Sequence, residues 1–242
     1  MARHEGRADD ALRKVEIVPG YLSQPHGSVL IRMGETQVLC AATVEDSVPV
    51  FLRETGQGWI TGEYAMLPAA TSTRTPREIN RGRPSGRTME IQRLVGRALR
   101  SVVDRKALGA RTVWVDCDVL QADGGTRTAS INGAWIALWH ACRRLVAKGT
   151  ISRNPVLDHV VGVSVGIVGG RVLADLDYSE DSGAEVDMNV VMTGNGRLIE
   201  VQGTAEREPF TRKQLDAMLS AAAVAGRKIL KEQRRFAEGG GR

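Results

Sequence analysis

The stretch RTVWVDCDVLQADGGTRTAS, residues 111–130, decides the fold because it predicts a strand, a glycine turn and a helix in direct succession. Gly124 and Gly125 allow a tight turn whose backbone N–H groups stay open to a ligand. The helix that follows directs its partly positive N-terminus at this turn, beside the Thr126 hydroxyl and the Arg127 guanidinium. The stretch therefore predicts a phosphate-binding loop. The alternative is a plain strand–turn–helix junction with a surface arginine.

The composition is that of a globular protein with a basic surface. The chain has 242 residues, of which 42% are hydrophobic and 25% charged, and its net charge is +5 with a sequence pI near 9.4. This charge favours a polyanionic partner. Aromatic residues make up only 4%, so a nucleic-acid surface cannot depend mainly on stacking rings.

The cysteines and the N-terminus point to the cytoplasm. Cys40, Cys117 and Cys142 fit neither a disulfide framework nor a zinc spacing, and each lies in an apolar run typical of a buried thiol. Residues 1–14 are charged and expected to be extended or ragged, without the apolar core of a signal peptide. No apolar run has the length of roughly 18 residues that a membrane span needs. We expect a cytoplasmic protein without membrane contact.

Hydrophobic periodicity predicts an α+β fold. Apolar residues recur every three or four positions in 91–103, in 131–145 and after Thr211, which indicates three helices. Strands are expected on both sides of Gly34, Gly169 and Gly194, where glycine-containing turns favour hairpins. The first sixty-odd residues, including a strand near 59–67, resemble an antiparallel meander. We expect mixed or antiparallel sheets covered by helices in one domain, residues 1–237, followed by a disordered tail, 238–242.

The two halves of the chain also share a pattern. Residues 28–39 and 164–173 place similar apolar runs on either side of a glycine. This weak internal echo favours two pseudo-equivalent halves.

Arginines dominate the connection before the first predicted helix. Residues 68–87 are rich in proline, glycine and small polar residues, and a loop of this length in a compact domain is functional or disordered. Its arginines without nearby acids are expected to contact a phosphodiester backbone: Arg74, Arg77, Arg81 and Arg83. Arg87 follows Ser85-Gly86 at the start of the helix, where a guanidinium can grip one phosphate. With Arg127 it would form a two-arginine clamp.

Six carboxylates lie close together in residues 175–187. They are Asp175, Asp177, Glu180, Asp181, Glu185 and Asp187. Carboxylate oxygens suit Mg²⁺, which takes one or two carboxylates together with phosphate oxygens and water. The alternative is a solvated acidic turn. The four histidines show no pairing that indicates nucleophilic catalysis.

Motifs along nearly the whole chain resemble the ribonuclease PH family of bacterial phosphorolytic exoribonucleases. The motifs, in family order, are Arg3…Glu5-Gly6-Arg7, GWITGEY (58–64), SGRTMEIQRL (85–94), DCDV (116–119), GGTRTAS (124–130), DMNVV (187–191) and EVQGTAE (200–206). Their combination is far more specific than any one of them.

The resemblance implies a fold, an assembly and an activity. The fold would be of the ribosomal protein S5 domain 2-like type, in a homohexamer built as a trimer of dimers. The activity would be phosphate-dependent 3′→5′ trimming of tRNA precursors beyond the CCA end, with release of nucleoside diphosphates. The reverse, nucleotidyltransferase reaction would add nucleotides from diphosphates. Processing of rRNA is a related expectation.

The resemblance also implies roles for single residues. Arg87, Gly125, Thr126 and Arg127 would bind inorganic phosphate. Asp181 and Asp187 would be the catalytic acidic pair, which holds Mg²⁺ or aids proton transfer. Ala69 stands where family members often have an arginine, which puts one RNA contact in doubt. Two rival functions remain: an RNA-binding ring subunit without chemistry, and a metal-dependent hydrolytic nuclease that releases monophosphates.

Overall fold

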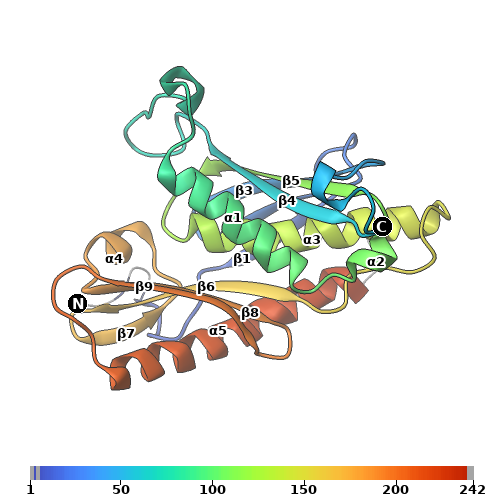
Figure 1. Ribbon diagram of the computed structural model, residues 1–242. Coiled ribbons are helices and arrows are strands. Elements are labelled where there is room, and N and C mark those ends of the chain that lie inside the picture. The colour runs from blue at the N-terminus through green and yellow to red at the C-terminus, as the bar shows by residue number, and fades with distance from the viewer. Residues whose placement is uncertain (1–2, 4–5, 239–242) are drawn as a thin grey trace.

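Two sheets and their helices make up the computed structural model (Figure 1), which describes residue 3 and residues 6–238. One sheet has five strands in the order β1-β2-β3-β5-β4, and the other has four in the order β7-β6-β8-β9. The strands are β1 (Val15–Pro19), β2 (Gly27–Met33), β3 (Thr36–Glu45), β4 (Trp59–Met66), β5 (Thr112–Gln121), β6 (Val160–Val168), β7 (Arg171–Ala174), β8 (Val186–Thr193) and β9 (Leu198–Ala205). The helices are α1 (Gly86–Arg100), α2 (Arg105–Leu108), α3 (Thr126–Ala147), α4 (Tyr178–Ser182) and α5 (Arg212–Glu238), with 3-10 turns η2 (Val50–Leu52) and η3 (Glu78–Arg81).

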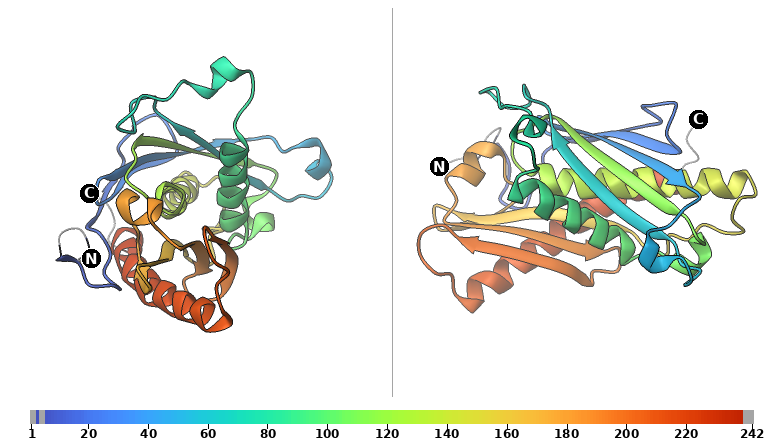
Figure 2. Two further views of the ribbon diagram at one scale, coloured as in Figure 1. Left: turned by 90° about the vertical axis from the view of Figure 1, so that its left-hand side faces the viewer. Right: turned by 45° about the horizontal axis from the view of Figure 1, so that its top comes forward.

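Helix α3 lies between the two sheets and joins them into one core. The left view of Figure 2 looks nearly along its axis, with one sheet above it and the other below. It packs against β2, β3 and β5 on one side and β6 on the other. Most of its side chains are therefore buried, including Trp135, which is 1% exposed. A helix with sheets on two sides needs apolar residues around most of its circumference.

A buried amide ties α3 to the second sheet. The Asn132 side chain accepts a hydrogen bond from the Gly162 N–H (2.8 Å) and donates one to the Gly162 carbonyl (3.0 Å). Asn132 is completely buried. These two bonds satisfy backbone groups of β6 that would otherwise be unpaired inside the core.

The three predicted glycine turns are confirmed. Gly34 (φ +57°) connects β2 and β3, and Gly169 (φ +57°) with Gly170 (φ +73°) connects β6 and β7. Gly194 and Gly196 belong to the turn between β8 and β9. Positive φ angles exclude most other residues from such tight hairpin turns.

The expected antiparallel meander is wrong at β4. This strand pairs only with β5, and the pairing is parallel, with Trp59 opposite Thr112 and Met66 opposite Val119. A parallel neighbour requires a long crossover connection, and α1 supplies it. The crossover brings the start of α1 close to the start of α3.

The α+β class and the ribosomal protein S5 domain 2-like fold are confirmed. Each half of the chain ends in a long helix, α3 or α5, that packs on its sheet. The three cysteines are buried free thiols, as expected. In the part of the chain that the structure describes, no helix is both long and apolar enough to cross a membrane. The expected tail lies outside the described residues, apart from Glu238, which ends α5.

Replacing Asn132 with leucine is expected to lower the free energy of unfolding by about 2–6 kcal/mol. The substitution keeps the volume but leaves two buried backbone groups unsatisfied, at about 1–3 kcal/mol each. Urea denaturation measures the loss. Gln121→Leu is the matched control, because the Gln121 amide bonds only to an exposed carboxylate, that of Glu35. Equal stability of the two variants would contradict this role of Asn132.

Candidate active site

The loop between β5 and α3 has its two glycines in left-handed conformations. Gly124 has φ +71° and Gly125 has φ +64°. A Cβ atom on Gly124 would lie 2.6 Å from the Leu176 carbonyl oxygen, so only glycine allows the second half of the chain to approach this closely. No side chain caps the start of α3. The N–H groups of its first turn therefore present a partial positive charge to a ligand.

The carbonyl oxygens of this loop are turned to other partners. The Thr36 hydroxyl donates to the Gly124 carbonyl (2.7 Å) and accepts from the Asp123 N–H (2.9 Å). The Arg13 guanidinium donates to the Asp123 carbonyl. An anion at the loop therefore meets N–H groups without repulsion from these carbonyl oxygens.

Arg87 is the second residue of α1, and a local cap fixes the start of that helix. The Ser85 hydroxyl accepts from the Thr88 N–H at 3.2 Å, and the Thr88 hydroxyl donates to Glu78 at 2.8 Å. Arg87 is exposed, and no described carboxylate forms an ion pair with its guanidinium. It is therefore available to an incoming anion.

Arg127 is held from the side by residues of α1 and β9. Its Nη1 donates to Gln202 Oε1 at 2.9 Å and lies 3.5 Å from Glu90 Oε2. The Gln202 amide nitrogen donates to Glu90 and to Glu200, at 2.9 Å each. The amide can therefore offer only its oxygen to Arg127. Gln202 and Glu90 lie in motifs of the family pattern, but the sequence does not show that they meet.

Tyr64 supports the same loop from β4. Its hydroxyl and that of Thr126 are 2.9 Å apart in the interior. Burial raises the pKa of Tyr64, so its hydroxyl keeps its proton. This contact orients Thr126 at the first position of α3.

Two carboxylates face the arginines from the second half of the chain. Asp181 belongs to α4, and Asp187 is the second residue of β8. Burial, together with the charge of Asp181, raises the pKa of Asp187 to about 6, although Arg127 and Arg87 oppose the shift. Burial likewise raises the pKa of Asp181, against the charges of the same two arginines. The site therefore contains one carboxyl group, that of Asp187, that can exchange protons near neutral pH.

All six residues predicted for phosphate and acid roles line one hollow. Its lining comes from the starts of α1 and α3, from α4 and from strands β6 and β8, and its volume is about 40 Å³. Its lining consists of Arg87, Gly125, Thr126, Arg127, Ser164, Asp181, Asp187 and Asn189. Ser164 and Asn189 are neighbours across β6 and β8 that sequence reasoning did not single out. The hollow suits a small anion beside a cation.

The four RNA-binding candidates divide into two groups. Arg77 lines a larger cavity of about 420 Å³ that also includes Arg87 and opens along the 75–88 segment. Arg74 and Arg83 are exposed and do not line this cavity. The Arg81 side chain lies outside the described part of the structure. The roles of all four in RNA binding stay predictions.

The alternative of a solvated acidic turn is wrong for half of the carboxylates. Asp175, Asp177 and Glu180 are 1%, 5% and 6% exposed. Their partners are arginines of the N-terminal segment, which was expected to be extended or ragged. Arg3 and Arg13 are in fact buried, each 6% exposed. Sequence spacing could not reveal these contacts, because they join residues about 160 or more positions apart.

The donor set fits Mg²⁺ bound by two carboxylates. Asp187 Oδ1 is buried and has no hydrogen-bond partner in the structure. No group of three or more histidine, cysteine or acidic side chains among the described residues forms a metal site. A site of two carboxylates completed by water and phosphate oxygens is what Mg²⁺ prefers.

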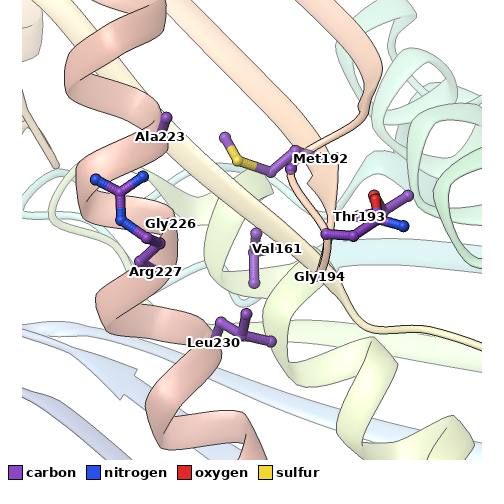
Figure 3. Close-up of a pocket in the computed structure, with 10 residues that line it drawn as sticks. Val161, Met192, Thr193, Gly194, Ala223, Gly226, Arg227 and Leu230 are labelled. Atoms are coloured by element: carbon purple, nitrogen blue, oxygen red, sulfur yellow. The ribbon is translucent and has the colours of Figure 1, made fainter.

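Another cavity, of about 190 Å³, has a different character. It lies between α5 and the turn from β8 to β9 (Figure 3). Val161, Met192 and Leu230 give it apolar walls, and the guanidinium of Arg227 points away from them. No group of convergent charges makes it a rival active site.

Comparisons with known proteins agree with the geometry. Models of the 3′ exoribonuclease family match residues 11–143 (domain 1) and 158–225 (domain 2). The chain is 59% identical to the ribonuclease PH of Moorella thermoacetica, covering 92% of this chain and 89% of that protein. It is 55% identical to the Bacillus pumilus enzyme, covering 96% of both chains.

Solved structures show the same architecture. A chain of the Archaeoglobus fulgidus exosome with RNA bound to the active site matches with a TM-score of 0.79 and 26% identity, over 95% of this chain and 92% of that one. Rice Rrp46 matches with a TM-score of 0.78 and 18% identity, over 97% of this chain and 100% of that one, which shows the fold alone.

Asp187→Asn is expected to be more stable than the wild type above pH 6, in urea denaturation without Mg²⁺ or phosphate. The pKa of Asp187 is about 6 in the folded chain, against an ordinary 3.8. Because the folded-state pKa is raised, the stability that this group contributes is complete below about pH 4 and is lost as the pH rises through about 6. The advantage of asparagine should therefore shrink toward pH 4. Asp216→Asn, at an exposed position of α5, is the control. A difference that stays constant with pH would refute the raised pKa.

Proposed function

The chain belongs to the 3′ exoribonuclease family that includes ribonuclease PH, and we propose that the hollow lined by Arg87, Arg127, Asp181 and Asp187 is its active site. The protein is a phosphate-dependent 3′→5′ exoribonuclease that processes tRNA, an enzyme of the nucleotidyltransferase type. The observation that carries the site is the convergence of two arginines, an uncapped helix start and two carboxylates in one small hollow.

Inorganic phosphate is the nucleophile in this proposal. Arg87 and Arg127 would hold it from two sides, while the first turn of α3 donates N–H groups. A phosphate oxygen forms a bond to the phosphorus of the terminal phosphodiester, and the bond from that phosphorus to the 3′-oxygen of the preceding nucleotide breaks. The products are a nucleoside diphosphate and an RNA shortened by one nucleotide. Positioning and charge stabilisation provide most of the catalysis, without a covalent enzyme intermediate.

Asp181 and Asp187 would serve the leaving side of the reaction. They are the residues that would hold Mg²⁺, which when bound neutralises charge on phosphate oxygens. The departing 3′-oxygen needs a proton. In the alternative role, with no metal ion on it, Asp187 would deliver this proton as a carboxylic acid, since a pKa of about 6 leaves part of the group protonated near neutral pH.

The RNA would lie along the cavity that continues from Arg87 to Arg77. Its apolar surfaces, from Met66 and Pro76, would contact the terminal nucleoside. Arg74, Arg81 and Arg83 would contact phosphates further along the RNA. The substrate favours a cytoplasmic location, where tRNA precursors are made.

Assembly into a homohexamer, a trimer of dimers, belongs to the same proposal. The similarity to exosome chains supports an oligomer. Val50 and Phe51 are 73% and 65% exposed, an apolar surface of the kind that a subunit contact covers. Multi-angle light scattering of the purified chain measures this assembly.

One assay separates the proposed function from its rivals. A 3′-extended tRNA is incubated with the protein and Mg²⁺, with and without phosphate, and the released nucleotides are identified. We expect nucleoside diphosphates, and only when phosphate is present. Monophosphates in both reactions would indicate a hydrolytic nuclease, and no products would indicate an RNA-binding ring subunit.

Arg127→Lys is expected to raise the KM for phosphate about tenfold or more, because a lysine lacks the guanidinium fork and a charged hydrogen bond is worth about 1.5–3 kcal/mol. Initial rates at increasing phosphate concentrations give this value. Arg93→Lys, at an exposed position of α1, is the control and should leave the KM unchanged. An Arg127→Lys enzyme with the wild-type KM for phosphate would remove Arg127 from the phosphate site.

A further inference from the structure

The helix that carries Asp181 cannot hold its position alone. Helix α4 has five residues, far fewer than an isolated helix needs to be stable in water. Asp175 lies two residues before Asp177, the N-cap residue of α4. It has φ +54°, an angle that is uncommon for residues other than glycine. Contacts from outside α4 must therefore fix its place.

The anchoring groups of α4 are buried carboxylates. The Asp177 side chain accepts from the Glu180 N–H at 3.0 Å, and Glu180 reaches back to the Asp177 N–H at 3.2 Å, which completes a capping box. Both side chains, like that of Asp175, are nearly inaccessible to solvent. Buried carboxylates of this kind need positive partners.

Those partners come from the opposite end of the chain. We call Arg3, Arg7 and Arg13 the arginine strap; their side chains are 1%, 8% and 5% exposed. Arg3 forms a fork on Glu180, with Nε 2.7 Å from Oε1 and Nη2 2.9 Å from Oε2.

Arg7 and Arg13 complete the pairing. Arg7 Nη2 lies 3.3 Å from Asp177 Oδ2 and 3.2 Å from Glu180 Oε2. Arg13 Nη2 lies 2.7 Å from Asp175 Oδ1. Burial raises the pKa of Asp177, but hydrogen bonds from its own cap and the nearby arginines hold it below the ordinary value. The strap thus neutralises all three carboxylates.

We propose that the arginine strap is a functional part of the active site, in which Arg3 and Arg7 are positioning residues for Asp181. They hold the capping box of α4, and Asp181 directly follows Glu180 in that helix. Arg13 connects the same structure to the phosphate loop through the Asp123 carbonyl. The N-terminal motif with Arg3 and Arg7 thus helps to position the carboxylate side of the site. This inference rests on the proposed function, because it adds supporting residues to the proposed active site.

Arg7 offers the sharpest test, because Arg3 and Arg13 also bond to several backbone carbonyls. Arg7→Met keeps much of the side chain's length but leaves Asp177 without its ion-pair partner. We expect kcat for phosphorolysis of a 3′-extended tRNA to fall about ten- to a hundredfold, as for other displacements of a catalytic group. The Mg²⁺ concentration for half-maximal rate should rise. The KM for phosphate should stay within about twofold, because the phosphate loop keeps its own supports.

Three further variants complete the experiment. Arg7→Lys restores the charge and should recover part of kcat. Arg7→Met combined with Asp177→Asn should also recover part, because asparagine still caps the helix but leaves no buried unpaired charge. Arg32→Met is the matched control; Arg32 pairs with Glu16 on the surface of β2. If Arg7→Met fails to fold, Arg7→Lys is compared with Arg32→Lys instead. It should show a smaller fall in kcat and a raised Mg²⁺ requirement, because lysine lacks the guanidinium fork. A kcat and Mg²⁺ dependence equal to those of Arg32→Lys would then overturn the proposal.

Two results would overturn the proposal. One is an Arg7→Met enzyme with the kcat and Mg²⁺ dependence of Arg32→Met. The other is a loss of kcat and phosphate affinity in equal measure, without recovery in the double variant, which would indicate a structural role only. A wild-type protein that releases no diphosphates would instead refute the proposed function, so the two failures are distinguishable.

Discussion

The buried ion pair between Arg13 and Asp175 is the interaction on which both sides of the proposed active site depend. The two side chains meet at 2.7 Å, and the Arg13 backbone N–H also donates to the same carboxylate, at 2.7 Å. Burial alone lowers the pKa of Arg13, but the surrounding carboxylates, chiefly that of Asp175, more than compensate and raise it. Loss of either partner would leave a buried charge unpaired, at a cost of about 3–5 kcal/mol. The pair therefore fixes the phosphate loop, through Asp123, relative to the chain that enters α4.

In the described part of the chain, the arginines and the carboxylates that line the hollow do not form ion pairs with one another, although their charges are opposite. Among the described residues, no ion pair joins Arg87 or Arg127 to Asp181 or Asp187. Arg127 instead pairs with Glu90, on the side facing α1 and β9. The arginines therefore retain their affinity for an anion, and the carboxylates have raised pKa values because burial outweighs the neighbouring positive charges. In the proposed function, such a site would bind a phosphate and a cation together more readily than either alone, since each would offset the charge of the other.

Local patterns in the sequence predicted those features that are set by local forces. The glycine hairpins, the amphipathic helices and the strand–loop–helix unit around Gly125 are of this kind, since backbone angles and periodicity decide them. The parallel pairing of β4 was missed because its partner, β5, lies beyond a loop and a helix. The buried partners of Glu180 and the support of Arg127 by Gln202 were missed because charged residues give no periodic signal for distant contacts. The family resemblance supplied the grouping of arginines with carboxylates that spacing alone could not.

The two halves of the chain contribute opposite charges to one site. Arg87 and Arg127 belong to the half matched by the first family model, and Asp181 and Asp187 to the half matched by the second. Helix α3 connects the two halves. Its first turn follows the glycine loop between β5 and α3, and its buried length packs against both sheets. Of the proposed site, the first half holds the two arginines and the second half holds the two carboxylates. The packing of the two sheets on α3, stabilised by the hydrophobic core, is thus what creates the hollow proposed as the active site. The arginine strap then fixes the position of α4, and with it that of Asp181, relative to the glycine loop.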